Sequence, residues 1–560
     1  MEILARLSLL FLSLLVLPHS ANAGDTLTPS KPLSGNRTLI SPTGLFALGF
    51  FTPAGTNNTY VGVWYNNIRL QTIVWVANRN TPVAAEATLF ISRNGTLLIT
   101  DSNSTVIWSS VISAPLNNSL AELLDNGNFV VREADSAHRF AWQSFDYPTD
   151  TIIPGMKIGV DFGAGINHSV AAWRSGSDPA AGSYTAAIDV HGDPQIFLRS
   201  GSESLWRSGP WNGFQFSGVP EITSYRQLSI SFFFVNTKEE VSYSFLSTNK
   251  SIVTRLLLNQ SGKLQRAVWV WDTEQWNFFW QAPGDQCDIY AACGPFGVCD
   301  PDESPVCDCL RGFTPMDPTK WALQDGSGGC RRMTALDCRN LTDGFVTLAG
   351  AKLPDTALTA VDMSMGLDKC RETCLRNCSC TAFAVANLSS ESGCLIWVTD
   401  LVDIRRYSGG GGQDLYVRLA AADLGAASGG HHHSKKSTAV IVSCVLVAVF
   451  LAFVAVGCFW GLRKRRKQSK SLEFIDARES ILLLNFIVIY LVLGNNNFHG
   501  GRVMGQEEHR DSSCELPCFQ LADLAAAIDY FSEENKLGEG GFGPVYKPKF
   551  DGSAFHWTEK

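Results

Sequence analysis

The placement of cysteine points most directly to chemistry. None of the 16 cysteines precedes Cys287, and twelve lie between Cys287 and Cys394. An even number at short intervals predicts disulfides made in an oxidising compartment. Zinc at Cys307-Asp-Cys309 or Cys378-Ser-Cys380 is the weaker alternative, because the adjacent ligands and histidines that it would use are missing. We therefore expect disulfides and no metal site.

A second chemical pattern is Gly538-x-Gly540-x-x-Gly543-x-Val545. Glycines at this spacing let backbone amides approach the phosphates of ATP, and with residues 514–537 they resemble the start of a receptor serine/threonine kinase domain. The V-A-x-K strand, the H-R-D loop and the D-F-G site do not follow in residues 532–560, so we interpret this kinase N-lobe as truncated. We expect no catalytic residues and no demonstrable cofactor here, with ATP and Mg²⁺ used only by full-length relatives.

Residues 438–462 form a stretch of 25 residues without one charge. Such a stretch is long enough for one transmembrane helix, and the basic run at 463–467 marks its cytoplasmic side. Residues 1–23 have the pattern of a cleaved signal peptide. The sequence thus predicts a single-pass type I plasma-membrane protein with its N-terminus outside, and a cytoplasmic juxtamembrane segment at 463–531.

A shorter apolar stretch at 481–494 is too short to cross a bilayer comfortably. A segment that dips into the membrane is one interpretation. The preferred one is that residues 471–513 and 548–560 are sequence foreign to the family.

The remaining exterior, of a little over 400 residues, corresponds to two to four domains. The composition is 11% aromatic, with 49 glycines, 23 prolines and a net charge of −8, which favours short strands and turns. The one basic run adjoins the membrane stretch, so nothing indicates a nucleic-acid partner. N-x-S/T sequons occur only before residue 438, and those predicted to carry glycans are Asn36, Asn57, Asn94, Asn103, Asn117, Asn167, Asn249, Asn259, Asn340 and Asn387. Asn377, between Arg376 and Cys378, is expected to be sterically unavailable.

Residues 24–150 contain three related turns, SPTGLFALG, SRNGTLLIT and LDNGNFVVR. In each, a glycine precedes alternating apolar residues, which predicts a pseudo-threefold closed β fold such as a β-prism. With WVANR at 75–79 and WQSFDYPTD at 142–150, this region resembles the bulb-type lectin domain of plant receptor-like kinases.

Those lectins bind mannose through a Q-x-D-x-N-x-V-x-Y motif, which this chain does not keep. Its five positions hold apolar or altered residues in the first two repeats, namely Ser41, Thr43, Leu45, Ala47 and Gly49, then Ser92, Asn94, Thr96, Leu98 and Thr100. In the third repeat, Leu124, Asn126, Asn128, Val130 and Arg132, only Asn128 and Val130 match. A pocket without its donors and acceptors binds sugar poorly, so we expect the fold without mannose binding.

Residues 151–283 continue the pattern of short alternating β-strands, and LWRSGPWNGF at 205–214 resembles the S-locus glycoprotein domain. We expect its aromatic residues to form core and a rigid Gly-Pro turn, although a tryptophan-rich β surface also suits a protein ligand.

Residues 284–337 resemble an epidermal-growth-factor-like module, which is too small to fold without bridges. The resemblance implies the pairs Cys287–Cys299 and Cys293–Cys307. No acidic run precedes it, so calcium is not expected.

Residues 338–419 resemble a PAN/apple α+β module. The spacing of Cys370 and Cys374 places both thiols on one face of a short helix, and the resemblance implies the pairs Cys370–Cys394 and Cys374–Cys380. The pairing of Cys309, Cys330, Cys338 and Cys378 stays open. Ser408–Gly412 and the stalk at 420–437 are expected to be flexible linker.

The chain is thus identified, by resemblance, as a member of the plant S-domain (G-type lectin) receptor-like serine/threonine kinase family, multidomain and mainly β. The resemblance implies an extracellular protein or glycan ligand, pairing with related receptors, and phosphorylation by full-length relatives, some of which recognise pollen. A kinase-truncated binding receptor and a sugar-binding lectin are the alternatives.

Overall fold

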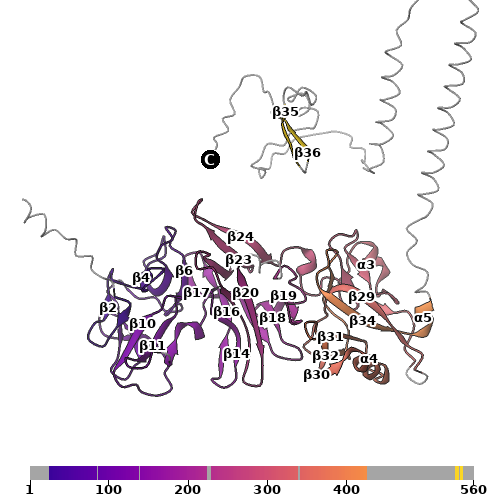
Figure 1. Cartoon of the computed structure of the whole chain (residues 1–560), viewed down its shortest axis with the longest axis horizontal. Coiled ribbons are helices and arrows are strands. Elements are labelled where there is room, and N and C mark those ends of the chain that lie inside the picture. Colours follow the sequence, from indigo (N-terminus) through magenta and orange to yellow (C-terminus); the bar gives the residue numbers. More distant parts are fainter. Residues whose placement is uncertain are drawn as a thin grey trace, which may run out of the picture. The chain divides into compact units, whose positions relative to one another are not determined.

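The computed structural model describes residues 24–84, 86–137, 139–222, 229–337, 341–425, 536–540 and 543–546. Two compact units divide the chain, Met1–Ser434 and Lys435–Lys560, and strands dominate the first (Figure 1). The predicted signal peptide at 1–23, the membrane stretch at 438–462 and the juxtamembrane segment at 463–531 lie outside the described residues. Among the residues that are described, no helix has the length and apolar character needed to span a bilayer.

Three four-stranded antiparallel sheets form the first β-prism, residues 26–143 (Figure 1). Their strands are β3 (Thr38–Ile40), β4 (Phe46–Phe51), β5 (Tyr60–Tyr65) and β6 (Ile73–Val76); β2 (Leu33–Ser34), β7 (Thr88–Ile91), β8 (Leu97–Thr100) and β9 (Val106–Ser109); and β1 (Thr26–Leu27), β10 (Ser119–Leu123), β11 (Phe129–Glu133) and β12 (Phe140–Gln143). The predicted threefold β fold is confirmed.

The three predicted glycine turns are equivalent in this prism. Gly44, Gly95 and Gly127 have φ of +77°, +93° and +85°, in the region that glycine adopts without strain. Each donates its backbone N–H to the carbonyl three residues earlier, at 2.8–3.0 Å. The repeated turn therefore fixes the register of each sheet.

A second β-prism of the same architecture occupies residues 151–282 (Figure 1). Its sheets contain β13 (Thr151–Ile152), β22 (Thr254–Leu258), β23 (Leu264–Val270) and β24 (Gln275–Ala282); β15 (Ile166–His168), β14 (Lys157–Asp161), β21 (Glu240–Ser247) and β20 (Ile230–Asn236); and β16 (Val170–Ser175), β17 (Asp178–Asp189), β18 (Gln195–Ser200) and β19 (Glu203–Pro210). The short helix η1 (Ser144–Asp146) precedes it.

The cysteine-rich region adds strands to one eight-stranded sheet, here called the C-terminal sheet. In spatial order the sheet contains β26 (Cys307–Cys309), β25 (Gly297–Cys299), β33 (Ile404–Arg406), β29 (Gly344–Lys352), β34 (Gln413–Leu419), β31 (Ala382–Asn387), β32 (Ser392–Trp397) and β30 (Ala360–Gly366). Outside it lie η3 (Gln286–Asp288), β27 (Phe313–Pro315), α3 (Pro318–Ala322), β28 (Cys330–Arg332), α4 (Leu367–Arg376) and α5 (Ala421–Gly425). The parallel pair β25–β33 joins the two cysteine modules into one body.

Ser408–Gly412, which the sequence suggested to be stalk, is instead the loop between β33 and β34. Gly410 and Gly412 have φ of +82° and +71°, and a Cβ on Gly412 would lie 2.6 Å from the carbonyl oxygen of Ala351. The glycines are therefore needed for a tight turn against β29.

Buried ion pairs join the second prism to the C-terminal sheet. The Oδ2 atom of Asp403 lies 2.7 Å from Nε of Arg207 and 2.8 Å from Nζ of Lys352. Arg207 also donates to the carbonyl oxygens of Leu353 and Asp403. Burial lowers the pKa of Lys352, an effect that the Asp403 charge opposes. One carboxylate thus balances two buried cations.

Replacing Asp403→Asn leaves the cations Arg207 and Lys352 buried without their shared anion. We expect the free energy of unfolding to fall by about 3–5 kcal/mol, measured by urea unfolding with disulfides intact. The matched control is Glu372→Gln, whose ion pairs with Lys369 and Arg376 are largely exposed and should matter little. Equal effects of the two substitutions would contradict this account.

Candidate functional site

Several of the positions that correspond to the mannose motif are buried or bonded within the chain. Asn128 is 3% exposed, its Nδ2 donates to Gln143 at 2.9 Å, and its Oδ1 accepts from the Ser144 hydroxyl at 3.2 Å. Val130 is fully buried, and in the first repeat Ser41 is also buried, where it accepts from the Phe46 N–H. The polar atoms that the motif retains are therefore used within the chain.

The WVANR segment has a structural role. Trp75, Trp108 and Trp142, one from the last strand of each first-prism sheet, meet edge-on with ring centroids 5.9–6.5 Å apart. Arg79 donates to the carbonyl oxygens of Pro179 and Ala171 in the second prism, at 2.7 and 2.9 Å. The segment thus closes one prism and attaches it to the next.

The LWRSGPWNGF segment is also mainly structural, as expected. Trp206 is buried, and Gly209 adopts a φ of +65° in a turn where a Cβ would meet the hydroxyl of Ser217. Asn212 is buried and accepts from the backbone N–H groups of Phe214 and Gln215. Phe214, in contrast, is 40% exposed.

The outer face of the β20–β21 hairpin carries an apolar strip of Phe233, Val235 and Leu246. These side chains are 46%, 37% and 44% exposed, and the cross-strand pairs Ser231↔Leu246 and Phe233↔Ser244 place them on one side. In the described part of its sheet, β20 is the edge strand. Only the structure shows which phenylalanine of β20 faces outward.

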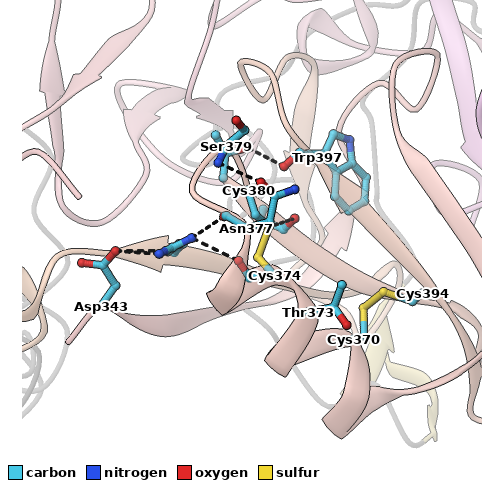
Figure 2. The surroundings of a disulfide bond; sticks show 12 residues. Asp343, Cys370, Thr373, Cys374, Asn377, Ser379, Cys380, Cys394 and Trp397 are labelled. Atoms are coloured by element: carbon cyan, nitrogen blue, oxygen red, sulfur yellow. Dashed lines mark hydrogen bonds and ion pairs between the residues drawn. A yellow bond between two sulfur atoms is a disulfide. The ribbon is translucent and has the colours of Figure 1, made fainter. Parts of the chain in front are cut away.

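Among the described residues, five disulfides hold the cysteine-rich region. They include the four pairs implied by the resemblance, Cys287–Cys299, Cys293–Cys307, Cys370–Cys394 and Cys374–Cys380, and a fifth, Cys309–Cys330. Cys370 and Cys374 both lie buried on one face of α4, from which one bond reaches β32 (Figure 2). Cys338 lies outside the described residues.

The disulfides and an ion pair together position α4. Arg418 of β34 is fully buried, lies 2.9 Å from Asp343, and donates to the carbonyl oxygens of Cys374 and Asn377 at the end of α4 (Figure 2). A cation at a helix C-terminus is favourable because the last carbonyl groups have no partner within the helix.

The sulfur atoms of Cys293, Cys299 and Cys307 lie within 4.8 Å of one another. Each is bonded in a disulfide and is therefore not a thiolate ligand. The same applies to Cys309 and Cys380 of the two candidate zinc pairs.

Most of the predicted glycosylation sites have exposed asparagines. Asn259 and Asn387 are half-buried, and Asn340 lies outside the described residues; exposed are Asn36, Asn57, Asn94, Asn103, Asn117, Asn167 and Asn249. Asn377, expected to be hindered, is exposed too.

The glycine-rich loop forms a hairpin in the second unit. Strand β35 (Lys536–Gly540) pairs with β36 (Gly543–Tyr546), and Gly538 lies opposite Val545. ATP binding by Gly538, Gly540, Gly543 and Val545 stays a prediction.

A buried carboxyl group lies where the second prism meets the C-terminal sheet. Asp193 is 7% exposed, its Oδ2 has no hydrogen-bond partner among the described residues, and burial raises its pKa to about 7. Its backbone carbonyl accepts from the Thr356 hydroxyl at 2.6 Å. This contact therefore holds an ionisable group without a counter-charge.

Profiles of three domains match the chain: the S-locus glycoprotein domain at residues 206–317, D-mannose binding lectin at 72–174, and the PAN-like domain at 338–404. Among solved structures, a monomeric monocot mannose-binding lectin from Gastrodia elata is 22% identical, covers 22% of this chain and 96% of its own, and has a TM-score of 0.17.

Curated relatives match most of the chain. "Receptor-like serine/threonine-protein kinase SD1-8" of Arabidopsis thaliana is 42% identical, and the match covers 96% of this chain but 62% of the relative. "Putative inactive G-type lectin S-receptor-like serine/threonine-protein kinase SRK" of the same plant is 38% identical with 96% of both covered. "S-locus-specific glycoprotein S6" of Brassica oleracea is 44% identical over 71% of this chain and 91% of its own.

The raised pKa of Asp193 predicts a pH dependence of stability. The folded state holds its proton up to about pH 7, whereas the unfolded state releases it near pH 4, so stability should fall as pH rises through this window, by about 4 kcal/mol at most. Urea unfolding at pH 5 and pH 7.5 gives the difference in the free energy of unfolding. Asp193→Asn should remove the part of this difference that comes from the Asp193 carboxyl group. Exposed Asp325→Asn is the control, and an unchanged pH profile in Asp193→Asn would contradict the assignment.

Proposed function

The chain belongs to the family of S-domain receptor-like kinases and S-locus glycoproteins, and on this premise we propose that it is a single-pass plasma-membrane receptor. Its disulfide-rich, sequon-bearing part lies outside the cell and recognises a protein or glycoprotein ligand. The uncharged stretch at 438–462 and the basic run after it support this orientation.

The observation that carries the ligand proposal is the apolar strip Phe233, Val235 and Leu246. Exposed apolar side chains on an edge hairpin are typical of surfaces that bind other proteins. In the first prism, in contrast, Asn128, the polar residue that matches the mannose motif, is buried and bonded within the chain. We therefore favour a protein surface over a monosaccharide as the main ligand.

Signalling is the second part of the proposal. The chain spans about 62% of the length of the SD1-8 kinase. The glycine spacing at Gly538–Val545 supports an interpretation as the start of a kinase domain. Full-length relatives would phosphorylate serine and threonine with ATP and Mg²⁺. A receptor that binds ligand without phosphorylating is the second candidate, favoured by the relative named putative inactive, which matches over 96% of its length.

Orientation can be tested by shaving intact cells that express the full chain with protease. We expect epitopes in residues 24–425 to disappear and an epitope at Gly538–Val545 to survive until the cells are permeabilised. Loss of the Gly538–Val545 epitope from intact cells, with residues 24–425 untouched, would sink the receptor proposal.

Ligand binding by the apolar strip can be tested with a photo-crosslinking residue in place of Phe233 in the full chain. This chain is exposed to extracellular fluid of the tissue that expresses it. We expect one discrete adduct from position 233 and none from the control position Leu70, which is 65% exposed on the first prism. In addition, Phe233→Ala should weaken binding of the captured protein by about tenfold or more. Identical adducts from both positions would contradict a specific surface.

A further inference from the structure

A cleft of about 800 Å³ lies where the second prism, the segment around η3 and the C-terminal sheet meet. Phe214 and Glu221 come from the prism, Asp285 and Asp302 from the cysteine-rich module, and Arg406 with the loop 408–412 from the C-terminal sheet. A cleft of this volume lies within the range of small-ligand sites and could hold several linked sugar rings.

The charges of the cleft are mostly matched. Arg405 lies 2.7 Å from both Asp285 and Asp288 and over the ring of Tyr407, while Arg406 faces Asp300 at 3.7 Å. With three carboxylates and two guanidinium groups on its walls, the cleft offers many oriented hydrogen-bonding groups with little net charge. This arrangement suits a neutral polar ligand better than a strongly charged one.

A further feature favours a hydroxyl-rich ligand. The exposed ring of Phe214 offers a flat apolar surface for the C–H face of a sugar ring. A mainly apolar peptide segment would instead leave the surrounding carboxylate and amide groups desolvated without partners.

The loop Gly409–Gly412 completes the cleft. Because glycine has no side chain, the backbone of this loop lines the cleft directly. A Cβ on Gly411 would lie 2.6 Å from Pro220. Glycine is suited to positions where a backbone must approach a ligand closely. Gly411 therefore packs the loop against the prism, and the loop lines the cleft with backbone rather than side chains.

We propose that this cleft binds a neutral oligosaccharide through Phe214 and the 408–412 loop. This goes beyond the proposed function, because it is a second site whose ligand is a glycan, apart from the apolar strip. It also differs from the mannose-motif positions of the first prism, none of which lines the cleft.

The test is binding of the purified full chain to cellotetraose, xylotetraose, mannotetraose and tetragalacturonate by calorimetry. At least one neutral tetrasaccharide should bind, at least tenfold more weakly after Phe214→Ala and unchanged after Leu70→Ala, whose exposed side chain lies outside the cleft. Hydrogen exchange of the backbone amides at residues 408–412 should slow when the sugar is bound. This measurement uses the wild-type chain and does not depend on any variant.

Three outcomes would overturn the proposal. The chain could bind tetragalacturonate alone, it could bind none of the sugars, or the wild type and Phe214→Ala could bind a sugar with equal affinity. A cross-linked protein at Phe233 together with no sugar binding would refute the cleft while leaving the protein-binding proposal intact. The reverse result would refute the apolar strip and retain the cleft.

Discussion

The position of the C-terminal sheet against the second prism depends on one buried carboxylate, Asp403, shared by Arg207 and Lys352. Removing such charges from water costs free energy that their attraction only partly returns, so the cluster contributes little net stability. Its geometry, however, is satisfied in only one arrangement of β19, β29 and β33. The cluster therefore contributes mainly to how the C-terminal sheet is placed against the second prism.

The first prism depends on backbone geometry and core packing. The turns at Gly44, Gly95 and Gly127 and the three central tryptophans are kept because backbone geometry and core packing require them. Of the mannose-motif positions, Asn128 and Val130 are buried, and the Asn128 side chain is bonded within the chain. Fold likeness to mannose lectins thus carries no sugar specificity by itself.

Local patterns in the sequence were sufficient for local structure. The glycine turns and the helical spacing of Cys370 and Cys374 correctly indicated a prism and a stapled helix, because both depend on neighbouring residues alone. The prediction that Ser408–Gly412 is flexible linker was wrong, because a run of glycine fits a linker and a tight turn equally well. The parallel pairing of β25 with β33, the bond Cys309–Cys330 and the burial of Asp193 depend on contacts distant in sequence, which spacing does not encode.

Charged and polar residues surround the apolar strip of the β20–β21 hairpin, and they limit what can bind to it. An exposed edge strand invites pairing with other chains, and proteins limit this with charge at strand ends. Here Lys238 and Glu239 stand exposed at the tip of the hairpin, and the β21 residues opposite Phe233 and Val235 are serines. Three apolar side chains alone offer too little area for stable self-association. A ligand must therefore match the polar surroundings as well, and this requirement makes a small exposed patch selective.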